Sequence, residues 1–440
     1  MASSQSAPFP LLALPDPCLV AVLQCCDQRS LLSAARTCPR LHQAAVLALR
    51  SISASIEQQH EANSVLLYLD RHGQHIDSLE LHGVYDSAVS LRQLPANLQL
   101  STLTLQEVAV QLQPGHGFQG VLGAAGAAAL KQLRLTSCKL LDEEGIEGAA
   151  APQLPTGLEH LSISDIYSDG KLTQFLTGMV QPMQHLTCLE LAFVQLKQGA
   201  LANMTQVRHL KLEFCTLKGA EGVEQLLHQL QHLPHLTHLD LVNSLICEED
   251  NPLAAAYSAL TASSKLQHLN ISGAMVPADA LLHIFPAGRR LPCLQLLALK
   301  GIQQPSGHQA TAPEGSCLVS CCPSLQSLDM QDLCCSAKLL APLLGLTGLQ
   351  TLRTQAEDRA AVEAVCRLTR LRELSIGCSA EDKQSPGGLW LELTQLRWLT
   401  SLSYWGHIDD GCVYNAYRRV NIESNVGSHQ CMPLSAASPC

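Results

Sequence analysis

The chain has 440 residues, and its formal net charge of −10 at pH 7 argues against a general nucleic-acid binder, which needs a basic face to replace the counterions of phosphate groups. Hydrophobic residues make up 47% of the sequence, but aromatic residues make up only 4%. This composition excludes a core organised around a few large rings and favours many similar layers of Leu, Val and Ala.

Residues 1–13 contain neither a basic segment nor an unbroken apolar core, so they do not match a secretory signal, and we expect them to be disordered. A short organelle transit peptide is the alternative for this Ser- and Ala-rich start. The odd number of cysteines, 19, favours reduced thiols over a disulfide framework. We therefore expect a location in the cytoplasm, the nucleus or both.

Three short helices are predicted within residues 14–50. Asp16 fits an N-cap position, and the proline after it fits the first position of a helix, directly before an apolar stretch. A second helix would contain two adjacent leucines, and Pro39 could begin a third. Residues 51–75 carry a further helical pattern, so we expect a helical linker there that caps the repeats described next.

The motif L-x-x-L-x-L recurs throughout residues 76–405. Its last two apolar positions flank a polar residue, so each motif predicts a short strand with two buried side chains. Apolar residues at helical spacing separate many of these strands, notably at 219–234, 251–265 and 359–370. The thirteen motifs begin at Ile76, Leu100, Leu130, Leu158, Leu186, Val207, Leu236, Leu266, Leu294, Leu325, Leu349, Leu371 and Leu399.

After the last motif the repeat fades. Residues 406–440 begin with several aromatic residues that could cover the open edge of the last repeat, and they end in a segment without a burial pattern. We expect this segment to form a C-terminal cap followed by a disordered tail.

The repeated motif closely resembles the leucine-rich-repeat family in its longer, ribonuclease-inhibitor-like form. The resemblance implies an α/β solenoid, a curved horseshoe with a parallel concave sheet and convex helices, preceded here by an all-α N-terminal module. The family usually has Asn or Cys at the ninth position of the repeat. Cys138 and Cys215 follow this rule. Irregular turns are predicted at the positions that depart from it, which are Val194, Ser244, Ala274 and Ile302.

Residues 14–44, with the sequence LPDPCLVAVLQCCDQRSLLSAARTCPRLHQA, resemble an F-box. That family is a three-helix module that docks onto the small adaptor of cullin-based ubiquitin ligases and is often followed directly by leucine-rich repeats. Two positions depart from its pattern, because Cys26 stands where Leu is usual and Leu41 where Trp is usual. The resemblance implies that the adaptor contacts Leu14, Pro15, Leu19, Val22, Leu23, Leu31 and Leu32.

The two resemblances together imply a substrate-recognition subunit of a cullin-type (SCF) ubiquitin ligase, whose partners are the adaptor and a protein substrate. The alternative is a scaffold or regulatory protein whose N-terminal helices only cap the repeats. The sequence has no P-loop, G-x-S-x-G, H-E-x-x-H or dinucleotide fingerprint, so we expect no enzyme, no cofactor and no metal site. We also expect no nucleic-acid or membrane partner, and a monomer outside the ligase complex.

On each predicted strand, the residues beside the two buried positions face outward, and equivalent residues on neighbouring strands form ladders with a spacing of about 4.8 Å. We interpret the first ladder as a row of tolerated outward residues rather than as a metal site or pH sensor, because no carboxylate at ligand spacing completes it. This ladder contains His160, Cys188, His209, His238 and His268. The next ladder contains Glu190, Lys211, Asp240 and Asn270. Its alternating charges can stabilise one another across the strands, which is the alternative to a binding site.

Two aromatic residues are predicted to be exposed on the same face. Phe193 and Phe214 occupy equivalent positions of consecutive repeats, and exposed aromatic residues are typical anchors of protein interfaces. The alternative is that a loop folds over them. The predicted partner-binding surface of the concave face consists of Glu190, Phe193, Lys211, Glu213, Phe214 and Asp240.

Overall fold

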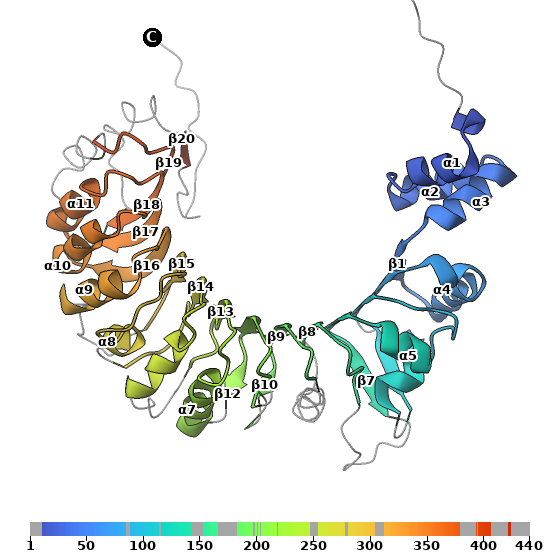
Figure 1. The fold of residues 1–440 in the computed structure, drawn as a ribbon, viewed down its shortest axis with the longest axis horizontal. Coiled ribbons are helices and arrows are strands. Elements are labelled where there is room, and N and C mark those ends of the chain that lie inside the picture. Colours follow the sequence, from blue (N-terminus) through green and yellow to red (C-terminus); the bar gives the residue numbers. More distant parts are fainter. Residues whose placement is uncertain are drawn as a thin grey trace, which may run out of the picture. The chain divides into compact units, whose positions relative to one another are not determined.

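The chain divides into two compact units, Met1–His209 and Leu210–Cys440, each of which contains parallel strands with helices beside them (Figure 1). The computed structural model describes residues 11–84, 89–113, 116–142, 153–165, 183–196, Gly199, 201–202, 204–217, 219–246, 254–277, 280–303, 312–378, Leu393, 395–405 and 421–423. The start of the predicted N-terminal segment and most of residues 406–440 therefore lie outside the described residues.

The N-terminal module contains the helices α1 (Asp16–Leu23), α2 (Gln28–Ala35) and α3 (Pro39–Ala48), and α3 contacts both of the others. Asp27 caps α2, because its Oδ1 accepts a hydrogen bond of 2.9 Å from the backbone N of Ser30. Arg40 at the start of α3 forms an ion pair of 2.7 Å with Asp16 of α1. The carbonyl of Leu14 also accepts a hydrogen bond from Arg40, so one guanidinium joins α3 to the segment that leads into α1.

Two segments at this end differ from the sequence predictions. Residues 11–13, expected to be disordered, form the short 3-10 helix η1 (Leu11–Ala13). Residues 51–75 are not helical throughout, because strand β1 (Ser51–Ile56) precedes helix α4 (Gln59–His72) and the 3-10 helix η2 (Gly73–His75). The stretch SISASI of β1 alternates apolar and polar residues and pairs in parallel with β2 (Ser78–Gly83), so its period of two fits a strand and not a helix.

All thirteen predicted strands are present, and β1 and β20 (Asn421–Glu423) are additional. In the first unit the strand order is β1-β2-β4-β6-β8-β9, and in the second it is β13-β14-β15-β16-β17-β18-β19-β20. Strand β11 (His209–Glu213) begins at the last residue of the first unit. The other bounds are β4 (Thr102–Gln106), β6 (Gln132–Thr136), β8 (His160–Ser164), β9 (Cys188–Ala192), β13 (His238–Asp240), β14 (His268–Asn270), β15 (Leu296–Ala298), β16 (Ser327–Cys335), β17 (Thr351–Ala356), β18 (Glu373–Cys378) and β19 (Ser401–Trp405).

Shorter elements follow the main strands and complete the outer layer. In the second unit, the helices lie outside the arc of strands (Figure 1). Two of the three predicted helical stretches are α-helices, α7 (Gly219–Leu230) and α11 (Arg359–Cys366), whereas the third is a 3-10 helix, η3 (Ala254–Thr261). The remaining elements are β3 (Ser90–Leu91), β5 (Ala109–Leu112), α5 (Gly117–Ala129), β7 (Lys139–Asp142), β10 (Gln195–Leu196), β12 (Thr216–Leu217), α8 (Ala280–Ile284), α9 (Ala312–Cys321), α10 (Ala337–Leu340) and η4 (Ala341–Gly345).

The core of most repeats consists of the two apolar side chains that the motif predicts, whereas in β17 the second position is the buried Thr354. Leu239 and Leu241 are both fully buried, and Leu239 lies beside Leu269 of the neighbouring strand. The same burial holds for Leu133, Leu135, Leu210 and Leu212. One parallel strand per repeat, with its leucine pair buried against a helical layer, confirms the α/β solenoid fold that the sequence predicts.

A left-handed residue follows most strands at one fixed place in the repeat, two residues after the second buried apolar position. Glycine occupies it at Gly273, where φ is 72° and an added Cβ would lie 1.8 Å from Oδ1 of Asn243. Asn243 itself has a φ of 51°. The other left-handed residues at this place are Glu107, Ser137, Phe193, Phe214, Gly301 and Asp332.

The turn at Ser244 is regular, which corrects the prediction from the ninth repeat position. The buried Ser244 hydroxyl donates to the carbonyl of Leu212 at 3.0 Å and accepts from the backbone N of Cys215 at 3.0 Å. A serine hydroxyl can both donate and accept, so it satisfies the backbone groups that Asn or Cys serves elsewhere.

Among the described residues, no helix is long and apolar enough to cross a membrane.

The buried leucines should dominate stability. We expect Leu239→Ala to lower the free energy of unfolding by roughly 2–5 kcal/mol, because it leaves a cavity between two strands. The matched control is His238→Ala on the outward side of the same strand, whose ring contacts His268 and should contribute only about 0.2–1 kcal/mol. Urea unfolding followed by circular dichroism measures both, and equal losses would show that the facing of this strand is wrong.

Candidate protein-binding surfaces

The structure separates the residues predicted to contact an adaptor into two groups. Leu19, Leu23 and Leu31 are buried inside the three-helix module, so they hold its helices together and are not available to a partner. This corrects their assignment as contact residues. Val22 and Leu32 are each 44% exposed. Pro15 is also exposed, and Leu14 is half-buried.

Two further leucines of the module are exposed that the sequence did not single out. Leu11 and Leu12 lie in η1, directly before α1, at 39% and 47% exposure. Arg40 donates a hydrogen bond to the carbonyl of Leu12, which ties this segment to α3. Because residues 1–13 were expected to be disordered, nothing in the pattern pointed to a fixed apolar surface here. The module therefore exposes apolar side chains on η1, α1 and α2.

On the outward face of the second unit, Lys211 and Glu213 alternate along β11 and form an ion pair of 2.8 Å with each other. The carboxylate of Asp240 is half-buried on β13, beside Asn270 of β14. Its Oδ1 is among the buried side-chain oxygens of the described residues that have no hydrogen-bond partner. An acceptor in this state is costly to leave without a donor, which is a property expected of a residue that a partner satisfies.

Burial raises the pKa of Asp240, because desolvation disfavours the carboxylate, although the nearby charges of Lys211 and His268 act in the opposite direction. Hydrogen bonds from the backbone of Val242 and the side chain of Asn270 also favour the ionised form of Asp240. These contacts and the neighbouring charges thus offset the cost of burying the carboxylate only in part.

Asp240→Asn tests the raised pKa of Asp240 through the pH dependence of stability. Above the ordinary pKa of 3.8, the folded wild type still holds a proton that the unfolded chain has released, so rising pH favours unfolding up to the raised pKa. The variant lacks this penalty. We expect the stability difference between variant and wild type to grow as pH rises through this window in urea titrations, and a constant difference would contradict the raised pKa.

Phe193 and Phe214 are each 43% exposed, as predicted. Both occupy the left-handed place that follows a strand, with φ of 57° and 50°. This conformation is strained for a bulky side chain and costs on the order of 1–3 kcal/mol. A large aromatic residue that is both strained and exposed points to a role outside folding. Phe193 belongs to the first unit and Phe214 to the second.

Substitution of Phe214 should change the free energy of unfolding less than is usual for so large a side chain. Asn tolerates the left-handed conformation, so we expect Phe214→Asn to change the free energy of unfolding by no more than about 1 kcal/mol, as strain relief offsets the lost partial burial. The matched control is the fully buried Phe118 of α5, where Phe118→Ala should cost about 3–5 kcal/mol. Thermal and urea unfolding compare the two, and a loss at Phe214 as large as that at Phe118 would show that it is a core residue.

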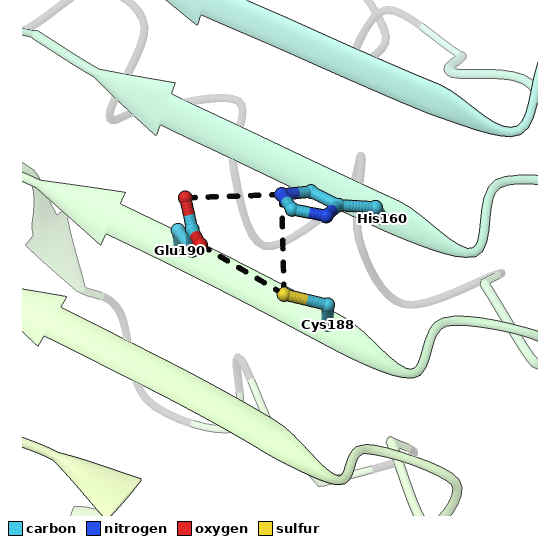
Figure 2. A group of neighbouring side chains, drawn as sticks. All are labelled: His160, Cys188 and Glu190. Carbon is cyan, nitrogen blue, oxygen red and sulfur yellow. Dashed lines mark hydrogen bonds and ion pairs between the residues drawn. The ribbon is translucent and has the colours of Figure 1, made fainter. Parts of the chain in front are cut away.

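The first ladder contains a cluster that the sequence interpretation missed. His160 and Cys188 are neighbours in register on β8 and β9, and the carboxylate of Glu190 reaches both of them (Figure 2). Nε2 of His160 lies 3.7 Å from Oε2 of Glu190, and Sγ of Cys188 lies 3.9 Å from both Nε2 and Oε1. The prediction that no carboxylate completes this ladder is therefore wrong.

Two groups of this cluster have pKa values that their neighbours shift. The His160 imidazole, 3.7 Å from the carboxylate, lowers the pKa of Glu190 to about 2. Burial, followed by the charge of Glu190, raises the pKa of the Cys188 thiol to about 12. Without a further cation, the thiol is thus a neutral donor beside an ionised carboxylate.

No family model matches this sequence, and no curated protein matches it. Among solved structures, an internalin from Listeria monocytogenes is 15% identical with a TM-score of 0.42, over 97% of this chain and 100% of that one. The plant peptide hormone receptor RGFR1, in complex with RGF2, is 14% identical with a TM-score of 0.43, over 81% of this chain and 55% of that one. At this similarity neither protein informs function, and the fold assignment rests on the strands and registers above.

Proposed function

We propose that this chain is a substrate-recognition subunit of a cullin-type ubiquitin ligase, in which the N-terminal module binds the adaptor and the outward face of the repeat sheet binds a protein substrate. The observation that carries the proposal is the module itself, a unit of three helices directly before the first repeat strand with exposed apolar side chains on its surface. Such exposed side chains are useful in a docking module and have no benefit in a plain cap.

The resemblance of residues 14–44 to an F-box supports this assignment, and the structure adds a division of roles within that segment. The buried leucines form the module's interior, so the adaptor would contact Val22, Leu32, Pro15 and the two leucines of η1. Asp16 and Arg40 would hold η1 and α1 in place for this contact.

The outward face of the repeats offers the chemistry for a protein partner. Phe214 provides an exposed aromatic anchor, Asp240 provides an acceptor that lacks a donor, and the pair Lys211 and Glu213 provides charges of both signs. The chain would contribute proximity to the ligation reaction, since it would hold the substrate near catalytic groups that belong to other subunits. Its proposed location is the cytoplasm, the nucleus or both, where such ligases would meet their substrates.

Adaptor binding by purified full-length protein tests the proposal. We expect Val22→Asp and Leu32→Asp each to weaken adaptor binding by at least about 30-fold, because a charge in an apolar contact removes a hot-spot interaction. Both side chains are exposed, so the melting temperature should change little. Isothermal titration calorimetry measures the first effect and circular dichroism the second.

The matched control is Leu67→Asp, which places the same charge on an exposed leucine of α4, outside the module. It should leave adaptor binding unchanged. If the wild-type chain does not bind an adaptor at all, the ligase assignment fails, and a scaffold whose helices only cap the repeats replaces it. If Leu67→Asp weakens adaptor binding as much as Val22→Asp does, the adaptor-binding surface is not confined to the module.

A further inference from the structure

His160, Cys188 and Glu190 bring together the three side-chain types that bind zinc most often, an imidazole nitrogen, a sulfur and a carboxylate oxygen. They come from two neighbouring strands whose register is fixed by paired leucines, Leu161 beside Leu189 and Ile163 beside Leu191. The positions of the three Cβ atoms are thus set by the core of the repeat and not by a loop. All three side chains are half-buried and face outward from the sheet.

The distances in the cluster are close to those of a zinc site. Zinc bonds of about 2.3 Å to sulfur and about 2.1 Å to nitrogen or oxygen, at tetrahedral angles, place sulfur and nitrogen about 3.6 Å apart and nitrogen and oxygen about 3.4 Å apart. The observed separations are 3.9 Å between Sγ and Nε2 and 3.7 Å between Nε2 and Oε2. Glu190 contacts the two residues through different oxygens, and with one donor atom per residue the three atoms lie within 4.8 Å of one another. Closure around one ion therefore requires rotation of the Glu190 carboxylate, in addition to a shift of a few tenths of an ångström between Sγ and Nε2, and no movement of the strands.

We propose that His160, Cys188 and Glu190 form a binding site for a single Zn²⁺ ion on the outward face of the first unit. Three protein ligands leave the fourth tetrahedral position open to water. The site is independent of the adaptor surface and goes beyond the proposed function, since neither docking nor substrate selection requires a metal.

The donor atoms of the cluster suit a divalent cation in charge and type. Arg134 of β6 acts on Glu190 and Cys188 and opposes a further cation, whereas Ser162, between Arg134 and Glu190 in the register, is neutral. An ionised carboxylate and a thiolate would give the site a charge of −2, which balances Zn²⁺. Soft sulfur with imidazole favours zinc over Mg²⁺ or Ca²⁺, which prefer sites made of oxygen alone.

Backbone hydrogen bonds place His209 one strand further along the same ladder. The backbone N atoms of Arg208 and His209 both donate to the carbonyl of Thr187, and this pattern repeats the one by which Thr187 and Cys188 follow Glu159. His209 is therefore beside Cys188 in the register. A separate His209→Ala variant shows whether the fourth position of the site is filled by water or by the His209 imidazole.

Metal binding by the full-length reduced protein tests the proposal, with Co²⁺ as a spectroscopic probe and Zn²⁺ as the competitor. We expect one equivalent of Co²⁺ to give a thiolate charge-transfer band and the intense visible bands of tetrahedral cobalt, and Zn²⁺ to displace it. His160→Ala, Cys188→Ala and Glu190→Gln should each weaken this binding by at least about 100-fold, because even the loss of an outer-shell partner costs 10–100-fold.

Two control variants exclude other thiols and histidines. Cys25 and Cys26 are adjacent and exposed, so the double change to Ala removes one pair of accessible alternative thiols and should leave the cobalt spectrum unchanged. His268→Ala removes another histidine of the ladder and should also leave it unchanged. Circular dichroism of Glu190→Gln, which keeps the shape of the side chain, confirms that lost binding does not reflect lost folding.

The outcomes are distinct. Loss of the spectrum in all three ligand variants, with both controls unaffected, establishes the site. A cobalt spectrum that survives in Cys188→Ala, or that disappears with the Cys25 and Cys26 changes, overturns the proposal, as does a wild type whose spectrum equals that of Cys188→Ala. None of these results depends on adaptor binding, so failure of the metal site and failure of the ligase assignment are separate findings.

Discussion

The burial of two apolar side chains from each short strand is the interaction on which the rest of the structure depends. Each fully buried leucine contributes about 1.5–3 kcal/mol from removal of its surface from water. Most repeats contribute a leucine and a second apolar side chain, whereas β17 contributes Leu352 with the buried Thr354. The pairs also align the strands, as Leu239 beside Leu269 shows. Since the inward side fixes the register, the residues that alternate with the leucines hold defined positions on the outward face without contributing much to stability.

A second constraint comes from the turn that ends each strand. The backbone enters the left-handed region at the same place of the repeat. Glycine occupies this place at Gly273 and asparagine at Asn243, whereas other repeats have a phenylalanine that is poorly suited to the conformation. Gly273 also leaves room that Asn243 needs, because a Cβ at that position would collide with the Asn243 side chain. The structure therefore distinguishes positions where the residue suits the turn from positions such as Phe214, where it does not.

The sequence predicted the strands and their facing because Leu-x-Leu alternation is a local signal, and it predicted the helices at the N-terminus. The predicted N-cap at Asp16 is wrong by one position, because Pro15 occupies the N-cap of α1 and no side chain caps this helix. The sequence missed β1, whose SISASI alternation lacks leucine and does not match the repeat motif. It also missed the cluster at Glu190, because a ladder pairs only residues directly opposite each other on neighbouring strands. A glutamate is long enough to reach a diagonal neighbour about 7–8 Å away on the next strand, so Glu190 meets His160 across two ladders. Which leucines of the module are buried depended on helix packing, and no local pattern encodes that.

Two outward residues share a property beyond exposure, because each is poorly suited to its position in the fold. Asp240 is a carboxyl whose pKa is raised by burial and whose Oδ1 lacks a donor, and Phe214 is an exposed aromatic residue in a strained conformation. Both residues cost folding free energy that a neutral polar residue or a glycine at the same position would not. In a solenoid whose stability comes from nearest-neighbour packing of leucines, such costs are local and tolerated, and a bound partner or ion is the interaction that would offset them.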